Sequence, residues 1–233
     1  MGSPIVIGVA GGSGSGKTTL VASVARALGP RAVTVIHHDS YYRDRGGYPP
    51  REREKLNYDH PDSLDSRLLA SHLKKLRAGA PVTVPVYDFK THLRRANGRR
   101  VAPGKAIILE GMLIYAEKEL RDLIDIKFFI DADDDIRFIR RMGRDMRSRG
   151  RGMMSVVSQY LGTVRPMHAD FVVPSRRHAD VILPWGATPA AAAVIAACIR
   201  SWRSWRDGFH RSGTCDGPKN RDAARGMALL RVP

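Results

Sequence analysis

Cysteine is scarce in this chain, which contains only two cysteines in 233 residues. Cys198 lies in an alanine-rich segment, and Cys215 lies near the end of the chain. Two isolated cysteines offer neither the spacing of a metal site nor the framework of a disulfide-stabilised domain. We therefore expect a reducing, cytoplasmic setting.

Long apolar runs are missing as well, and none approaches the roughly 20 residues that a membrane-spanning helix needs. The opening segment PIVIGVA leads into a glycine-rich loop and not into the cleavage site of a signal peptide. No internal repeat is present. With 43% apolar and 27% charged residues, the composition is that of an ordinary globular domain with no membrane partner.

Lysine is scarce too: the chain has nine lysines and 30 arginines. Its formal net charge is +16. The densest block, Arg137–Arg151, carries seven arginines and a single aspartate. An evenly spread charge would suggest a polyanionic partner. The planar fork of arginine suits phosphate oxygens, although such a block can also be a solvated face of a helix.

Short apolar runs alternate with segments of helical pattern, and this alternation is typical of a parallel sheet covered on both faces. We predict a doubly wound, mostly parallel five-stranded α/β sheet with helices on both faces. The predicted strands are 4–10, 32–38, 106–111, 126–131 and 179–184. The predicted helices are 18–28, 63–78, 117–123, 132–149, 153–164 and 189–202.

Two further segments stand outside this alternation. Residues 81–103 contain VTVPVYDF and GRRVAP on either side of the turn-like ANG, which predicts a β-hairpin that leaves the main sheet. From position 207 onward Gly, Pro, Arg and Asp mix without a period, so we predict a disordered tail over 207–233. The folded domain is expected to cover residues 1–206.

The segment GVAGGSGSGKTTL fits the phosphate-loop pattern G-x-x-x-x-G-K-S/T, directly after a predicted strand and directly before a predicted helix. Its backbone amides can wrap a phosphate, Lys17 can reach the outer phosphates, and Thr18 can ligate magnesium. The motif indicates a nucleoside triphosphate but does not choose among kinases, switches and motors. The expected nucleotide-binding residues are Gly11, Gly12, Ser13, Gly14, Ser15, Gly16, Lys17, Thr18 and Thr19.

Two carboxylates stand at the ends of predicted strands, where an open parallel sheet binds its ligands. Asp39 and Glu110 are expected to face the phosphate loop; one can hold a metal and the other can take a proton from an attacking hydroxyl. An alcohol acceptor benefits from such a base, whereas a phosphate acceptor does not need one. A zinc site at His37, His38 and Asp39 is disfavoured, because neighbouring residues on a strand point to opposite faces.

Several longer motifs together make the chain similar to the uridine kinase (uridine–cytidine kinase) family, from about Ile5 to about Trp185. They are HDSYYRD (38–44), NYDHPDSLD (57–65), VPVYDFKTHLR (84–94), ILEGML (108–113), RRMGRDMRSRGR (140–151), SQYLGTVRPM (158–167) and ADVILP (179–184). The resemblance implies phosphoryl transfer from ATP (or GTP) with Mg²⁺ to the 5′-hydroxyl of uridine or cytidine. It also implies a cytoplasmic homotetramer in pyrimidine salvage, and a nucleic acid is not the expected partner.

The resemblance implies roles for individual residues. Asp39 is implied as the catalytic base, and Lys17, Arg144 and Arg149 as the other catalytic residues, the arginines belonging to a helical lid over about 137–152. Thr18, Asp39 and Glu110 are implied around the magnesium. The implied acceptor-binding residues are Asp59, Arg141 and Gln159 at the ribose, Tyr87 and His92 at the base edge, Tyr42, Tyr58 and Phe89 as aromatic walls, and Arg151 nearby.

The chain departs from the family where the donor base would bind. After ADVILP the family has an arginine and then a polar or acidic residue, whereas Trp185 and Thr188 stand here, so the choice between ATP and GTP stays open. Kinases related to phosphoribulokinase or pantothenate kinase are the nearest alternatives, and NYDHPDSLD and PVYDF argue against them. A non-catalytic nucleotide-binding regulator, which would meet RNA through its basic surface, is the alternative from another class.

Overall fold

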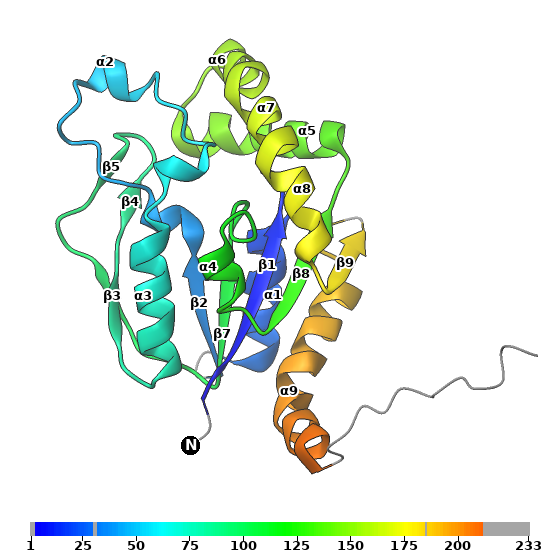
Figure 1. Cartoon of the computed structure of the whole chain (residues 1–233). Coiled ribbons are helices and arrows are strands. Elements are labelled where there is room, and N and C mark those ends of the chain that lie inside the picture. Colours follow the sequence, from blue (N-terminus) through cyan, green and yellow to red (C-terminus); the bar gives the residue numbers. More distant parts are fainter. Residues whose placement is uncertain (1–2, 30–31, 185, 212–233) are drawn as a thin grey trace, which may run out of the picture. The chain divides into compact units, whose positions relative to one another are not determined.

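The computed structural model describes residues 3–29, 32–184 and 186–211 (Figure 1). The chain divides into two units, Met1–Ile199 and Arg200–Pro233. The first unit contains the sheet and both cavities discussed below. Helix α9 (Pro189–Arg211) extends past the predicted domain end at 206, so it overlaps the first part of the predicted tail. The remainder of that prediction, 212–233, lies outside the described residues.

The central sheet has five parallel strands in the order β2-β7-β1-β8-β9. Each predicted strand is present, so the predicted fold class is confirmed. β1 is buried along its whole length, because helices cover both faces of the sheet. The strands are β1 (Ile5–Gly11), β2 (Val33–His37), β7 (Ala106–Glu110), β8 (Ile126–Asp131) and β9 (Val181–Pro184).

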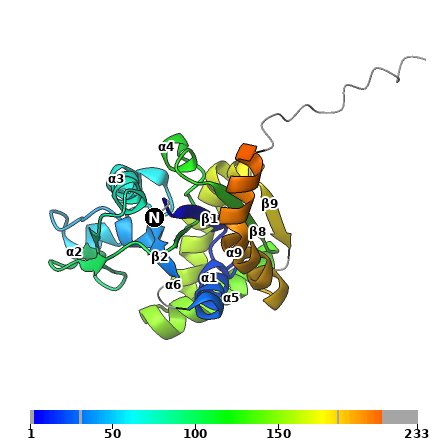
Figure 2. The ribbon, with the colours of Figure 1, turned by 90° about the horizontal axis from the view of Figure 1, so that it is seen from below.

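Two helical layers enclose the sheet (Figure 2). On one side lie α3 (Ser66–Arg77) and α4 (Lys118–Arg121), and the other side carries α1 (Lys17–Leu28) and α5 (Asp134–Arg149). The side chains between α3 and the sheet are fully buried, and each leucine there contributes about 1.5–3 kcal/mol to folding. They include Leu69, Leu73, Leu76, Ile107 and Leu109.

The segment after α3 leaves the main sheet as two short antiparallel pairs. β3 (Val82–Val84) pairs with β6 (Arg99–Val101), and β4 (Tyr87–Asp88) pairs with β5 (Leu93–Arg94). The chain therefore reverses at 89–92, and the turn predicted at ANG (96–98) is wrong. The Asp88 carboxylate accepts from the backbone of Lys90 at 2.9 Å and fixes the earlier turn.

A long helical ribbon follows α5 and extends well past the predicted end at 164. After α6 (Met153–Gln159), α-helical and 3₁₀ turns alternate with two π-helical segments, Tyr160–Val164 and His168–Val172, and continue to His178. Pro166 and Pro174 would interrupt a regular α-helix. Each stands early in a short α-helical turn that follows one of the wider π-helical segments, so the ribbon accommodates both prolines.

None of the helices in the described part of the chain combines the length and the apolarity needed to cross a bilayer.

Candidate active site

The nine residues that the sequence predicts for nucleotide binding run from the last residue of β1, Gly11, through the connecting loop 12–16 to the first three residues of α1. Gly14 and Gly16 have φ angles of 81° and 97°, a region in which residues with side chains are strained. A Cβ atom on Gly11 would lie 2.6 Å from the carbonyl oxygen of Ile130. Lys17 Nζ donates to the Gly12 carbonyl at 2.9 Å, so the ammonium folds over the loop at the N-terminus of α1.

The two predicted carboxylates lie beside this loop. Glu110, the last residue of β7, accepts hydrogen bonds from Thr18 Oγ1 at 3.0 and 3.1 Å and faces His37 Nδ1 at 2.6 Å. Asp39 lies in the 3₁₀ turn His38–Tyr41 that follows β2. Thr18, Asp39 and Glu110 line one cavity of about 290 Å³ together with Lys17 and Arg144.

The protein environment drives the pKa values of the two carboxyl groups in opposite directions. Burial, with the nearby charge of Glu110, raises the pKa of Asp39. Burial also acts to raise the pKa of Glu110, but the hydrogen bond from His37 and the charge of Lys17 outweigh it and the net shift is downward. Burial lowers the pKa of Lys17. A carboxylate with a raised pKa beside one with a lowered pKa is the arrangement expected of a proton acceptor beside a metal ligand.

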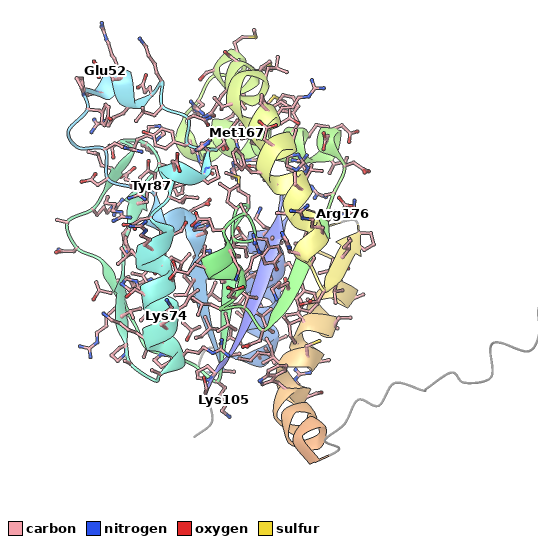
Figure 3. The ribbon with its side chains drawn as sticks, viewed as in Figure 1. Glu52, Lys74, Tyr87, Lys105, Met167 and Arg176 are labelled. Carbon is pink, nitrogen blue, oxygen red and sulfur yellow. The ribbon has the colours of Figure 1, made fainter. Side chains whose placement is uncertain are left out.

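A second cavity, of about 560 Å³, lies next to the first and is lined by all nine residues predicted to bind the acceptor. Asp39 and Arg144 line both cavities. Figure 3 shows Tyr87, from the second cavity, on the same side of the molecule as Glu52 and Met167 and away from Lys105, which precedes β7. The second cavity is also lined by Ser13, Asp39 and Met112, which follow the carboxyl ends of β1, β2 and β7, so it lies where the sequence predicts binding.

Four aromatic side chains and one histidine form the wall of this cavity. Tyr42 packs at 5.0 Å against Tyr87 and at 6.2 Å against Phe89, measured between ring centroids. The ring of Tyr58 stacks on His92 at 4.5 Å and 15°, and the Tyr87 hydroxyl lies 3.4 Å from His92 Nδ1. Burial, with the charges of Arg151 and Arg149, lowers the pKa of His92. A neutral imidazole can both donate and accept a hydrogen bond.

The far end of the cavity is polar. Asp59 is only 5% exposed, accepts from Thr163 Oγ1 at 3.2 Å and lies 3.9 Å from Arg141 Nη1. Gln159 Oε1 accepts from Arg141 Nη2 at 3.0 Å and also from Arg151. The structure thus brings together four predicted residues, Asp59, Arg141, Arg151 and Gln159. The buried carboxylate of Asp59 can accept hydrogen bonds from sugar hydroxyls.

The arginine block is organised by one residue that the sequence analysis did not select. Asp145 is fully buried, and its carboxylate lies 2.9 Å from Arg144 Nε, 3.4 Å from Arg149 Nη1 and 3.5 Å from Arg141 Nε. The predicted lid residues therefore meet at one carboxylate. Asp145 is the single acidic residue inside the basic block, and this contrast was the signal in the sequence.

Two more residues of the site were not predicted, and one predicted residue makes a contact that was not foreseen. Thr163 reaches Asp59 from the first π-helical segment, and His37 contacts Glu110. Arg141 Nη1 also donates to the hydroxyl of Ser13 at 2.9 Å, which gives Ser13 a contact toward the second cavity. The sequence analysis assigned Ser13 to the phosphate loop only. All three contacts join residues far apart in the chain, so no local pattern could reveal them.

A glycine loop between the first strand and the first helix, with the lysine, hydroxyl and carboxylates at the end of a parallel sheet, defines a P-loop nucleotide-binding protein. The sequence model of the "Phosphoribulokinase / Uridine kinase family" matches residues 6–192. The chain belongs to this family, which confirms the predicted resemblance.

Similar proteins agree with this assignment. A uridine kinase of Brevibacillus brevis is 50% identical over 186 residues, covering 80% of this chain and 87% of the relative. A uridine kinase of Chloroflexus aurantiacus is 48% identical, covering 85% and 95%. The solved phosphoribulokinase of Rhodobacter spheroides has a TM-score of 0.55 at 15% identity, covering 78% of this chain and 70% of that chain. It shares the fold.

Proposed function

We propose that the protein transfers the γ-phosphoryl group of ATP to the 5′-hydroxyl of uridine or cytidine. Relatives that are about half identical over most of the chain are named uridine kinase, which supports an enzyme of this kind. The observation that carries the proposal is that Asp39 and Arg144 line both cavities. A donor in the first cavity and an acceptor in the second would meet at these two residues.

The first cavity suits the triphosphate. Backbone amides of the loop, at the N-terminus of α1, favour phosphate oxygens, and Lys17 lies in the same cavity. Thr18, Asp39 and Glu110 offer only oxygen atoms, which are the donors that Mg²⁺ takes in phosphoryl-transfer sites. These three residues would surround the ion, which would neutralise charge on the β- and γ-phosphates.

The second cavity suits a nucleoside. The four aromatic rings offer faces for a base, and His92 offers a ring nitrogen whose neutral form can serve either the 4-oxo group of uracil or the 4-amino group of cytosine. Asp59 lies at the polar end, where it would accept from ribose hydroxyls. A 5′-hydroxyl directed from there toward Asp39 would give its proton to that carboxylate as its oxygen bonds to the γ-phosphorus and the bond from that phosphorus to the departing ADP breaks.

The arginines complete the proposed mechanism. Phosphoryl transfer depends mainly on positioning and on neutralising charge. Arg144 lines both cavities, and Arg149 stands over the Phe89 ring at 4.5 Å. In this proposal both would meet phosphate oxygens while the nucleoside is held. GTP as donor, the homotetramer and the cytoplasmic location stay predictions; light scattering on the purified protein tests the assembly.

The experiment that tests the function is magnesium-dependent formation of ADP from ATP with a panel of acceptors. The panel is uridine, cytidine, thymidine, adenosine, ribulose 5-phosphate, pantothenate and no acceptor. We expect turnover with uridine and cytidine alone. Turnover with ribulose 5-phosphate or pantothenate would assign a different kinase activity, and ATP binding without turnover on any acceptor would indicate a non-catalytic nucleotide binder.

A further inference from the structure

His37 lies beside the proposed metal site but does not line the nucleotide cavity. It is the last residue of β2 and is the register partner of Glu110 on β7. Its Nδ1 atom lies 2.6 Å from Glu110 Oε1, and its side chain is 39% exposed against 8% for Glu110. The parallel pairing of the two strands thus places an imidazole against a nearly buried carboxylate.

Glu110 is approached from two sides. Thr18 reaches it from the nucleotide cavity, of which both residues are lining members. His37 instead lines an outer groove together with Val35, Tyr87 and Arg99. The imidazole therefore contacts the carboxylate without occupying the space where a metal or phosphate would bind.

We propose that His37 is a positioning residue that fixes the orientation of Glu110 for the divalent cation bound with the nucleotide. A glutamate at the end of a strand has three side-chain torsions to fix, and a hydrogen bond of 2.6 Å to one oxygen restricts them. Nδ1 can carry the donated hydrogen in the neutral ring as well as in the charged ring. The inference rests on the proposed function, because it concerns the metal of that reaction.

Partners of this kind, which orient a metal ligand from behind, typically change metal affinity by 10–100-fold when they are lost. We therefore expect His37→Ala to weaken Mn²⁺ binding in the presence of adenylyl imidodiphosphate by about tenfold. Binding of the nucleotide without metal should change less than about twofold, because the loop amides and Lys17 are untouched. His37→Asn should restore most of the affinity, since its amide nitrogen can occupy the place of Nδ1.

The test is titration calorimetry of the full chain with Mn²⁺ and adenylyl imidodiphosphate, and then with the nucleotide alone in EDTA. His178→Ala, which removes a histidine at the end of the helical ribbon, is the matched control and should match the wild type. Circular dichroism and the thermal midpoint establish that each variant is folded.

Two results would overturn the inference: unchanged Mn²⁺ affinity in His37→Ala, or equal losses in His37→Ala and His37→Asn. The proposed metal site fails differently. In that case the wild type would bind the nucleotide equally well with and without metal, and Glu110→Gln would not alter the Mn²⁺ affinity. Comparing the Glu110 and His37 variants therefore separates the two failures.

Discussion

Arg141 and Ser13 join the two cavities, because the guanidinium donates to the serine hydroxyl at 2.9 Å. Ser13 belongs to the phosphate loop, whereas Arg141 also donates to Gln159 and lies near Asp59. A single nearly buried side chain thus contacts the loop proposed for the donor and the groups proposed for the ribose. Displacement of the loop would therefore also displace Arg141 relative to the groups proposed to bind the ribose.

Ser13→Ala removes this contact without altering the backbone amides of the loop. A hydrogen bond from a charged donor contributes about 1.5–3 kcal/mol, so we expect the KM for uridine to rise by about tenfold. The KM for ATP should change by less than about threefold, because the amides and Lys17 hold the phosphates. Steady-state kinetics with each substrate varied in turn measures the difference. Ser3→Ala, far from both cavities, serves as the control, and equal changes in both KM values would contradict the prediction.

Asp39→Asn tests the proposed base. The amide cannot accept the proton of the 5′-hydroxyl, and loss of a general base typically lowers the rate by about 10²–10⁴-fold. ATP affinity, measured by calorimetry without metal, should stay within about threefold of the wild type. A near-normal kcat in this variant would show that Asp39 is not the catalytic base, whatever the effect of the substitution on binding.

The main sheet and the phosphate loop could be predicted because their signals are local. The runs at 4–10 and 106–111 are continuously apolar, and strands buried on both faces require such runs. The loop is fixed by glycines that tolerate positive φ. The clustering of Asp39 and Glu110 with the loop was also predictable, because the carboxyl ends of parallel strands meet at the same edge of a sheet.

The remaining features depend on contacts between distant residues. The hairpin reverses at 89–92 and not at ANG, because the Asp88 turn and the packing of Tyr87 and Phe89 on Tyr42 fix its register. Thr163 reaches Asp59 across 104 positions. Thr163 lies in a π-helical segment, whereas the sequence predicts a single helix over 153–164. The predicted helix therefore did not indicate that Thr163 contacts Asp59.

Asp59→Ala tests how the ribose is recognised. A buried carboxylate left without a hydroxyl partner disfavours a deoxy analogue, and such sites can discriminate by up to about 10⁴–10⁵-fold. We expect the kcat/KM ratio of uridine to 2′-deoxyuridine to fall by at least about tenfold in the variant. Thr163→Val, which removes only the hydroxyl next to Asp59, should lower that ratio less. An unchanged ratio in Asp59→Ala would place recognition of the 2′-hydroxyl elsewhere.

Asp145→Asn tests the residue that gathers the arginines. Removing one partner of a buried ion pair typically costs about 3–5 kcal/mol, so the free energy of unfolding should fall by roughly this amount. Because Arg144 and Arg149 lose their common anchor, kcat should fall by about 10–100-fold, as expected when positioned charges are displaced.

Turnover of the Asp145 variant must be referred to folded enzyme. Calorimetric titration with ATP gives the number of competent sites, and kcat per site should still be reduced. Asp135→Asn removes the same charge from an exposed position of the same helix and should leave stability within about 0.5 kcal/mol. Normal turnover per competent site in Asp145→Asn would restrict Asp145 to a role in folding.

His38 makes stability depend on pH. The side chain is 1% exposed and packs against Gly111, and burial lowers its pKa from about 6.5 to about 4 although Glu110 opposes the shift. Between these values the unfolded chain binds a proton that the folded chain does not. The free energy of unfolding therefore decreases as the pH falls from about 6.5 to about 4.

A pKa difference of this size corresponds to a decrease on the order of 3 kcal/mol across that range. His38→Gln, which does not titrate, should lose less stability than the wild type between pH 7 and pH 5, by about 1–2 kcal/mol. Urea unfolding of both proteins in EDTA at the two pH values measures this difference, and EDTA keeps bound metal out of the comparison. His60→Gln, which removes a histidine whose side chain is 38% exposed, provides the control and should follow the wild type. Parallel decreases in the wild type and in His38→Gln would show that His38 is already solvated, or protonated, in the folded protein at pH 5.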